Sequence, residues 1–279
     1  MTTGATRTFF LCVLLALPAM VNGAAPATRI VSLSPHLTEL AFDAGAGPGL
    51  VGVVEYSDHP VEARMLPRVG DAFRIDRETL ASLEPDLILA WAGGTPTATV
   101  EQLRRDGYRV VMIETGDPEE VAAALEKIAE LAGTEDTAAP LAEAFRAGFS
   151  ELRRRFADRP PVRVFVQISP RPLYTVGAGQ IIDSVLTTCG GRNVFGEIEQ
   201  LAPVVTDEAV IAADPQVIIA PSAAAEDVLT RWHKYPGIAA VRSGRLHIVE
   251  GDLLSRQSLR LLEGAREICA LLDEARDGP

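Results

Sequence analysis

Residues 78–90 read Glu78-Thr-Leu-Ala-Ser-Leu-Glu-Pro85-Asp-Leu-Ile-Leu-Ala90, and residues 208–220 repeat the pattern as Glu208-Ala-Val-Ile-Ala-Ala-Asp-Pro215-Gln-Val-Ile-Ile-Ala220. Each copy predicts a short helix that opens with an acidic residue and stops at a proline, because proline cannot continue a helix. A buried strand follows in each copy. A period of about 130 residues is too long for a solenoid repeat, so the duplication predicts two related lobes with a ligand cleft between them.

A second pair of related segments precedes the first. Arg29-Ile-Val-Ser-Leu-Ser-Pro35 resembles Arg163-Val-Phe-Val-Gln-Ile-Ser-Pro170, and each predicts a strand that ends in Ser-Pro before a helix that closes on glycines. Apolar runs separated by helical patterns favour parallel strands covered on both faces. The expected strands are 30–33, 50–54, 87–90 and 110–113 in the first lobe and 162–168, 217–220 and 245–249 in the second.

The predicted fold is α/β, with two Rossmann-like lobes that have parallel central sheets and are joined by a single long helix. Apolar side chains recur at helical spacing from Pro140 to Ala157, which predicts this connecting helix. A helix connection limits opening and closing more than a flexible linker does. The expected parts are a signal peptide at 1–23, an N-terminal α/β lobe at 24–137, a connecting helix at 138–159 and a C-terminal α/β lobe at 160–279.

The N-terminus has the pattern of an export signal. Arg7 provides a positive start, the apolar run 9–17 follows, and Pro18 breaks it before small residues. The run is too short to span a bilayer, so we expect a soluble periplasmic protein that begins near Ala24. Cys12 lies inside the apolar run without the small residue that lipid attachment needs, and we expect it to be removed with the signal.

Composition excludes one class of partner. A formal net charge of −12 argues against nucleic acid, because its affinity for proteins depends on Lys and Arg at the phosphates. An apolar content of 47% is sufficient for buried cores. Two cysteines, Cys189 and Cys269, remain after signal removal. In an oxidising compartment they favour one disulfide, and the alternative is two buried free thiols.

Enzyme motifs are missing from the chain. It contains no Gly-x-Ser-x-Gly, no P-loop and no Cys-x-x-Cys, and its four histidines lack the i, i+4 spacing of a metal site. We therefore predict a binding protein and no enzymatic activity, with an exported α/β enzyme as the competing class.

The expected ligand contacts follow from the strand ends. Ligands of parallel α/β sheets bind beyond the carboxyl ends of the strands. Aromatic side chains are scarce in this chain, yet three of them fall at such ends, where they offer large apolar area. The candidates are Pro35, His36, Tyr56, Trp91, Tyr174, Asp252 and Arg256.

The chain resembles the iron-siderophore and cobalamin class of periplasmic solute-binding proteins, and most closely its cobalamin-binding members. The resemblance covers essentially the whole mature chain. It rests on 32–42 (Ser-Leu-Ser-Pro-His-Leu-Thr-Glu-Leu-Ala-Phe), 56–60 (Tyr-Ser-Asp-His-Pro), 84–94 (Glu-Pro-Asp-Leu-Ile-Leu-Ala-Trp-Ala-Gly-Gly), 163–167 (Arg-Val-Phe-Val-Gln) and 189–195 (Cys-Gly-Gly-Arg-Asn-Val-Phe). It implies a ligand bound between two lobes and delivered by a monomer to a dimeric inner-membrane ABC importer, with no cofactor of the protein's own.

The resemblance assigns roles to particular positions. It implies that the ligand contacts are Pro35, Tyr56, Trp91, Tyr174 in place of a phenylalanine, Asp252 and Arg256, and that Cys189 pairs with Cys269. It also implies that Glu78 and Glu208 dock on arginines of the importer. The alternative for these two glutamates is simple stabilisation of a helix N-terminus.

The chain departs from the cobalamin binders in its cleft. Two further cleft tryptophans of that class correspond here to Ala72, beside Phe73, and to Ala202. His36 replaces a small residue and is a candidate axial ligand of cobalt or haem iron. We therefore predict that the ligand is cobalamin or a related corrinoid, with a ferric siderophore or haem as the alternative in the same class.

Overall fold

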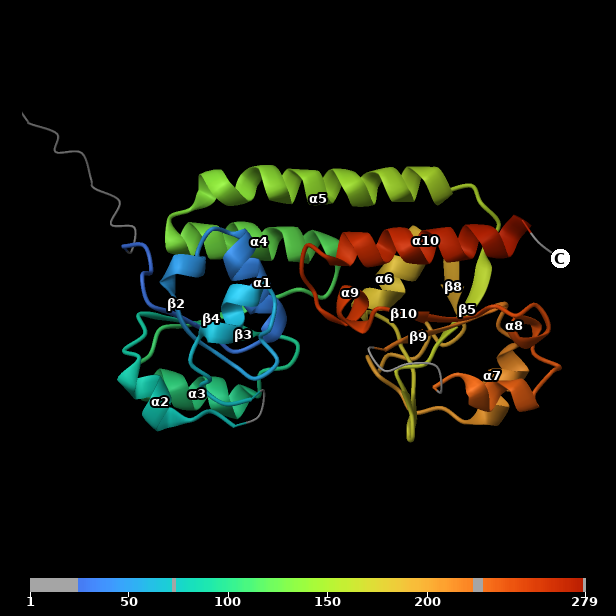
Figure 1. The fold of residues 1–279 in the computed structure, drawn as a ribbon, viewed down its shortest axis with the longest axis horizontal. Coiled ribbons are helices and arrows are strands. Elements are labelled where there is room, and N and C mark those ends of the chain that lie inside the picture. Colours follow the sequence, from blue (N-terminus) through green and yellow to red (C-terminus); the bar gives the residue numbers. More distant parts are fainter. Residues whose placement is uncertain (1–24, 72–73, 223–227, 278–279) are drawn as a thin grey trace, which may run out of the picture.

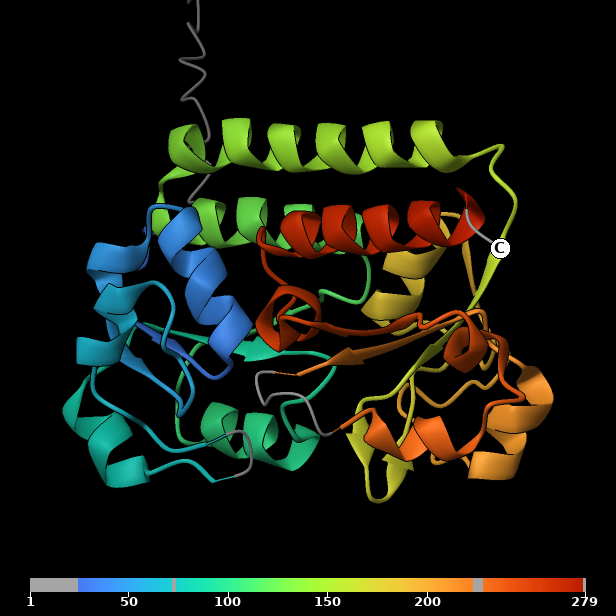
Figure 2. The same cartoon turned by 45° about the vertical axis from the view of Figure 1, so that its right-hand side comes forward.

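The computed structural model describes residues 25–71, 74–222 and 228–277. Two α/β lobes lie side by side under a long helix, α5 (Figures 1 and 2). The first lobe contains β1 (Ile30–Ser32), α1 (Pro35–Asp43), β2 (Leu50–Val53), α2 (Arg77–Ser82), β3 (Leu87–Trp91), α3 (Thr97–Arg105), β4 (Val110–Ile113) and α4 (Pro118–Ala132). After α5 (Glu135–Phe156), the second lobe contains β5 (Val162–Val166), β6 (Ser169–Pro170), β7 (Leu173–Tyr174), α6 (Ile181–Thr188), β8 (Gly191–Asn193), α7 (Asp207–Ala213), β9 (Val217–Pro221), α8 (Ala239–Arg242), β10 (Leu246–Val249), α9 (Gly251–Ser255) and α10 (Leu261–Asp277).

The two central sheets have the same topology. In the described residues, the first sheet has the order β2-β1-β3-β4, and the second, read in the equivalent direction, has the order β8-β5-β9-β10. Every pairing within these two sheets is parallel. The repeated segments therefore occupy equivalent places, since α2 leads into β3 and α7 leads into β9. The prediction of two related α/β lobes is confirmed.

The lobes are joined by more than the single helix that the sequence predicted. One continuous apolar cluster includes buried side chains of α1 and α4 in the first lobe, of α5, and of α6 and α10 in the second. Gly148 of α5 faces Leu262 so closely that an added Cβ would lie 2.4 Å from that side chain. Because α5 packs on helices of both lobes, burial of apolar surface resists a change in the lobe spacing.

Helix α5 begins earlier than predicted. It spans 22 residues, or about 33 Å at 1.5 Å per residue. Its first turn carries Glu135 and Asp136, whose charges favour a helix N-terminus, and Pro140 follows inside the helix. The predicted division of the chain at 138 and 159 remains a prediction. In the described residues, no helix is both long enough and apolar enough to cross a membrane.

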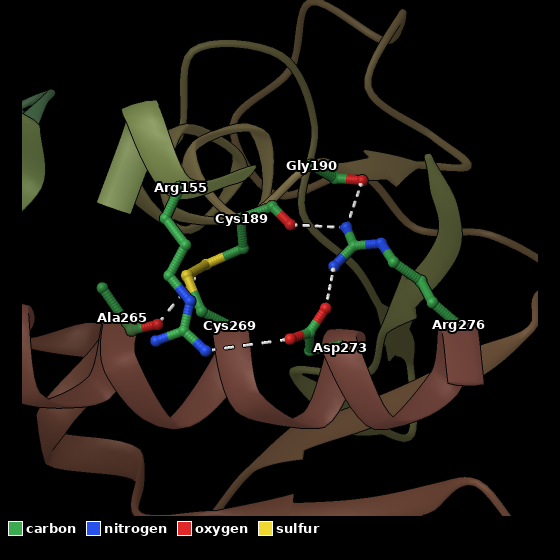
Figure 3. Close-up of a disulfide and its surroundings, with 7 residues drawn as sticks. All are labelled: Arg155, Cys189, Gly190, Ala265, Cys269, Asp273 and Arg276. Carbon is green, nitrogen blue, oxygen red and sulfur yellow. Dashed lines mark hydrogen bonds and ion pairs between the residues drawn. A yellow bond between two sulfur atoms is a disulfide. The ribbon is translucent and has the colours of Figure 1, made fainter. Parts of the chain in front are cut away.

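The structure contains the predicted disulfide. Cys189 at the end of α6 is bonded to Cys269 in α10, with a Cα–Cα distance of 4.7 Å (Figure 3). Both cysteines belong to the buried apolar cluster, and Arg276 donates hydrogen bonds to the carbonyl oxygens of Cys189 and Gly190 at 2.7 and 3.1 Å. The bridge thus ties the first helix of the second lobe to the C-terminal helix.

Short elements were missed by the sequence analysis. β8 carries the glycine, arginine and asparagine of residues 191–193, which have no apolar run, yet it pairs with β5. The hairpin of β6 and β7 has two residues in each strand. The predicted loop after β10 begins with the short helix α9. Each of these elements is set by tertiary contacts, because its own sequence lacks the periodicity of a strand or a helix.

We expect the double variant Cys189→Ala and Cys269→Ala to fold with a lower free energy of unfolding. The bond joins residues separated by 80 positions, so its loss should cost about 4 kcal/mol in the chain-entropy model. Urea unfolding of the variant and of the oxidised wild type measures this difference. Equal unfolding midpoints with equal slopes would contradict the expectation.

Candidate functional site

A pocket of about 450 Å³ lies between the two lobes. It is formed at the carboxyl ends of β3 and β4 on one side and at the start of α6 on the other. The volume falls within the range of small-molecule sites. The lining residues are Trp91, Ala92, Gly93, Glu114, Thr115, Gly116 and Glu120 from the first lobe and Gly179, Gln180, Ile181, Leu201, Ala202 and Gln257 from the second.

Trp91 is the predicted ligand residue that lines this pocket. It ends β3, and its backbone N–H donates to the Oγ1 of Thr95 at 3.0 Å. The half-buried indole lies over the two following glycines, since a Cβ on Gly93 or Gly94 would meet the ring at 2.8 or 2.1 Å. The Trp-Ala-Gly-Gly sequence therefore has a steric reason: a larger residue at either glycine would displace the ring.

The ring of His36 packs against the ring of Trp91. Its imidazole meets the indole edge to face, with the ring centroids 5.0 Å apart. The Nδ1 atom lies 2.8 Å from the Oγ of Ser34, and the Nε2 atom lies 3.5 Å from the Oγ1 of Thr115. Burial lowers the pKa of His36 to about 3, so the ring is neutral at physiological pH.

The His36 imidazole is buried, with 5% exposure, and a protein hydroxyl faces each of its nitrogens. No cluster of three or more His, Cys, Asp or Glu residues suited to a metal ion occurs within residues 25–71, 74–222 and 228–277. The hypothesis that His36 is an axial ligand of a metal in the bound molecule stays a prediction.

A buried ionic network connects the lobes beside the pocket. The carboxylate of Glu39, on α1, accepts hydrogen bonds from the segment that links α9 to α10 in the second lobe. The donors are Arg256 at 3.0 Å, Ser258 at 2.7 Å, and Arg260 at 3.0 and 2.8 Å. The Glu39 side chain is 2% exposed, so these contacts form away from water. The network fixes α1 against the second lobe.

The charge of Glu39 controls the titration of its surroundings. Burial alone would raise the pKa of Glu39, but hydrogen bonds from Arg260, Ser258 and Arg256 hold that pKa below its ordinary value. One turn further along α1, burial and the negative charge of Glu39 raise the pKa of Asp43 to about 6. Glu39 is thus ionised and fully paired inside the protein.

Arg256 and Asp252, which were predicted to bind ligand, contact each other in the structure. An Nη atom of Arg256 lies 3.0 Å from a carboxylate oxygen of Asp252. The same guanidinium lies 2.7 Å from Asp58 and 3.0 Å from Glu39. Three carboxylates therefore surround Arg256, and a ligand must compete with them for this cation.

The remaining predicted contacts lie outside the lining of this pocket. Tyr56 follows β2 with a φ of 65° and is 79% exposed. Pro35 starts α1, and Tyr174 is half-buried in β7. Ala202, which the resemblance matches to a tryptophan of the cobalamin binders, lines the pocket, while Ala72 and Phe73 lie outside the described residues. The assignment of these positions to a ligand remains a prediction.

Several pocket residues were missed by the sequence analysis. Glu114, Thr115 and Gly116 follow β4, and the strand-end rule would have selected them had it been applied to that strand. Gln257 follows the short helix α9, which the sequence did not predict.

Glu78 and Glu208 occupy matching exposed positions in the first turns of α2 and α7. Other residues cap these helices: Asp76 accepts from the N–H groups of Glu78 and Thr79, and Thr206 accepts from that of Ala209. The two helices lie on the side of the molecule opposite α5 (Figures 1 and 2). The glutamates do not cap these helices, but both lie in the first turn, where their charges favour the helix N-terminus, so the docking role and the simple helix stabilisation both remain predictions.

Known proteins resemble the chain over both lobes. A family model described as periplasmic binding protein matches residues 30–252. A vitamin B12-binding protein of Vibrio cholerae is 33% identical over 263 residues, which cover 93% of this chain and 94% of the relative. The crystal structure of the periplasmic vitamin B12-binding protein BtuF of Vibrio cholerae superposes with a TM-score of 0.84 at 33% identity and covers 91% of this chain and 99% of that one. A periplasmic haem-binding protein from Pseudomonas aeruginosa superposes with a TM-score of 0.74 at 26% identity, with 88% and 92% covered.

We expect Glu39→Gln to lower the free energy of unfolding by about 3 kcal/mol at pH 7, because it removes the carboxylate that pairs with half-buried Arg260 and one of the three that surround Arg256. Since the folded-state pKa of Glu39 lies below 4.5, the stability that it contributes is present above pH 4.5 and is lost as the pH falls further. Urea unfolding between pH 7 and pH 3 should therefore show that the free energies of unfolding of the wild type and of Glu39→Gln converge as the pH falls. Glu143→Gln, at an exposed position on α5, is the control. A difference that does not change with pH would contradict the assignment.

Proposed function

The chain belongs to the family of periplasmic binding proteins, and we propose that within it the protein captures cobalamin or a related corrinoid and delivers it to an ABC importer of the inner membrane. The family identity agrees with the prediction of a solute-binding protein and not an enzyme. The observation that carries the ligand proposal is the pocket between the lobes, with the Trp91 indole at its wall. The identity to a protein named vitamin B12-binding protein supports it.

The proposed binding mode is apolar contact with a planar macrocycle. The indole of Trp91 offers a large flat surface, and His36 and the two glycines hold it in one orientation. Tyr56 and Tyr174 are proposed to add contacts as the ligand fills the cleft beyond the pocket. Ala202 leaves room where the cobalamin binders have a tryptophan, so the ligand would contact a less aromatic surface in the second lobe.

The proposed site of action is the periplasm. Other members of the family are periplasmic, and the export signal predicted at 1–23 lies outside the described residues. Cleavage near Ala24 would release the two lobes as a soluble monomer.

Delivery is proposed to use both lobes at once. Glu78 and Glu208 are exposed and do not cap their helices, and these helices, α2 and α7, lie on the same side of the molecule. A permease dimer presents two equivalent surfaces, and a protein with two equivalent lobes can contact both of them. Carboxylates at matching positions of the lobes would pair with arginines of the two permease subunits.

We expect the purified mature protein to bind cyanocobalamin with a sub-micromolar Kd, measured by calorimetry. Trp91→Ala should weaken binding by about 1–3 kcal/mol, because the flat apolar contact is lost. Cobinamide, haemin and a ferric siderophore are titrated into the protein in the same way. Tight binding of haemin or the siderophore, with no binding of either corrinoid, would replace the proposed ligand by the alternative within the same family.

Docking is tested separately from binding. Glu78→Arg combined with Glu208→Arg should abolish uptake of labelled cyanocobalamin in cells and leave its Kd unchanged, because each substitution places like charges at the permease surface. Glu130→Arg combined with Glu274→Arg is the matched control, since these exposed glutamates also lie one in each lobe. Normal uptake by the first variant would refute the docking proposal.

A further inference from the structure

The pocket presents a buried hydrogen-bond donor that the predicted ligand set did not include. Gln257 is 7% exposed and lines the pocket. Its Oε1 atom accepts a hydrogen bond from the Thr115 hydroxyl, whereas its Nε2 atom has no partner among the described residues. Because Gln257 lines the pocket, this N–H group can donate to an acceptor on a bound ligand.

Two carboxylates line the same pocket from the first lobe. Glu120 lies in the first turn of α4, and one of its oxygens accepts from the N–H of Gly116 at 2.6 Å. This bond holds the carboxylate at the pocket. Glu114, which follows β4, has no hydrogen-bond or ionic partner among the described residues. Both offer only acceptors when ionised, and Glu114 is exposed, so each can receive a hydrogen bond from a donor of a bound ligand.

The described residues that line the pocket include neither lysine nor arginine. Lys127 lies beside Glu114 and Glu120 in an adjoining pocket, where its ammonium group is paired with Glu130 at 2.7 Å. The nearby arginines of the inter-lobe network are already paired, because Arg256 contacts Glu39, Asp58 and Asp252, and Arg260 contacts Glu39. A carboxylate brought into the pocket by a ligand would therefore face like charge without compensation.

We propose that this pocket is a subsite for an uncharged primary carboxamide of the ligand, whose N–H groups donate to Glu114 and Glu120 and whose carbonyl oxygen accepts from Nε2 of Gln257. The chemistry is complementary, because a primary amide has both donors and an acceptor, as the three side chains require. Corrinoids carry such amides around their macrocycle. The inference rests on the proposed function, and it adds a charge filter that rejects peripheral carboxylates such as the propionates of haem.

The test exchanges one functional group of the ligand. In a cyanocobalamin monocarboxylic acid, one carboxamide is replaced by a carboxylate of nearly the same shape. Calorimetric titration of the wild-type protein with a set of these acids should show at least one that binds about tenfold or more weakly than cyanocobalamin. The double variant Glu114→Gln and Glu120→Gln should bind that acid and cyanocobalamin with affinities within about threefold of each other, because the repulsion is gone.

Matched variants separate this inference from general effects. Glu143→Gln combined with Glu151→Gln removes the same two charges from exposed positions on α5 and should keep the wild-type discrimination. Gln257→Glu keeps an oxygen for the Thr115 hydroxyl but removes the N–H donor, and it should weaken cyanocobalamin binding. Equal binding of every acid and cyanocobalamin to the wild type, or a discrimination that survives in the Glu114 and Glu120 variant, would overturn the subsite. Failure of the wild type to bind any corrinoid would instead overturn the proposed function, and the subsite with it.

Discussion

The buried carboxylate of Glu39 is the contact on which the ligand site depends most. It receives hydrogen bonds from Arg256, Ser258 and Arg260 of the other lobe, at a position that is 2% exposed. A buried ion needs its partners in place, because an unpaired charge in the interior costs several kcal/mol. The network therefore fixes α1 of the first lobe against the second lobe, beside the pocket. The apolar cluster shared by α4, α5 and α10 also holds the two lobes together.

The duplicated architecture gives both lobes a place at the pocket and in the proposed permease contact. The ligand pocket is formed where the carboxyl ends of β3 and β4 face the start of α6. The exposed glutamates are on α2 and α7, the helices that lead into β3 and β9. Each lobe thus contributes to the pocket and, by the proposed mechanism, to the permease contact. A fixed lobe spacing suits both tasks, since it preserves the pocket and the distance between the two docking positions.

The sequence predicted the architecture because the repeats are local patterns. Apolar strands such as Leu87–Trp91 and the proline stops that precede them can be recognised without the partner lobe. The bonding of Cys189 to Cys269 was likewise accessible from the cysteine count and the export signal. Contacts between distant segments were not accessible in this way. Glu39 follows Thr38 on α1, and nothing in its local sequence indicates that it is paired with Arg256 and Arg260, more than 200 residues away.

The ligand site was predicted in part for the same reason. Trp91 was found because a strand end is visible in the sequence, while Gln257 depends on α9, which forms only against the rest of the lobe.

The most direct test is a crystal structure of the protein with cyanocobalamin. We expect the corrin ring to lie against Trp91 and one carboxamide of the ligand to lie near Glu114, Glu120 and Gln257. We also expect the contact between Glu39 and Arg260 to be unchanged. A corrinoid bound away from the pocket, or lobes separated at Glu39, would contradict these expectations.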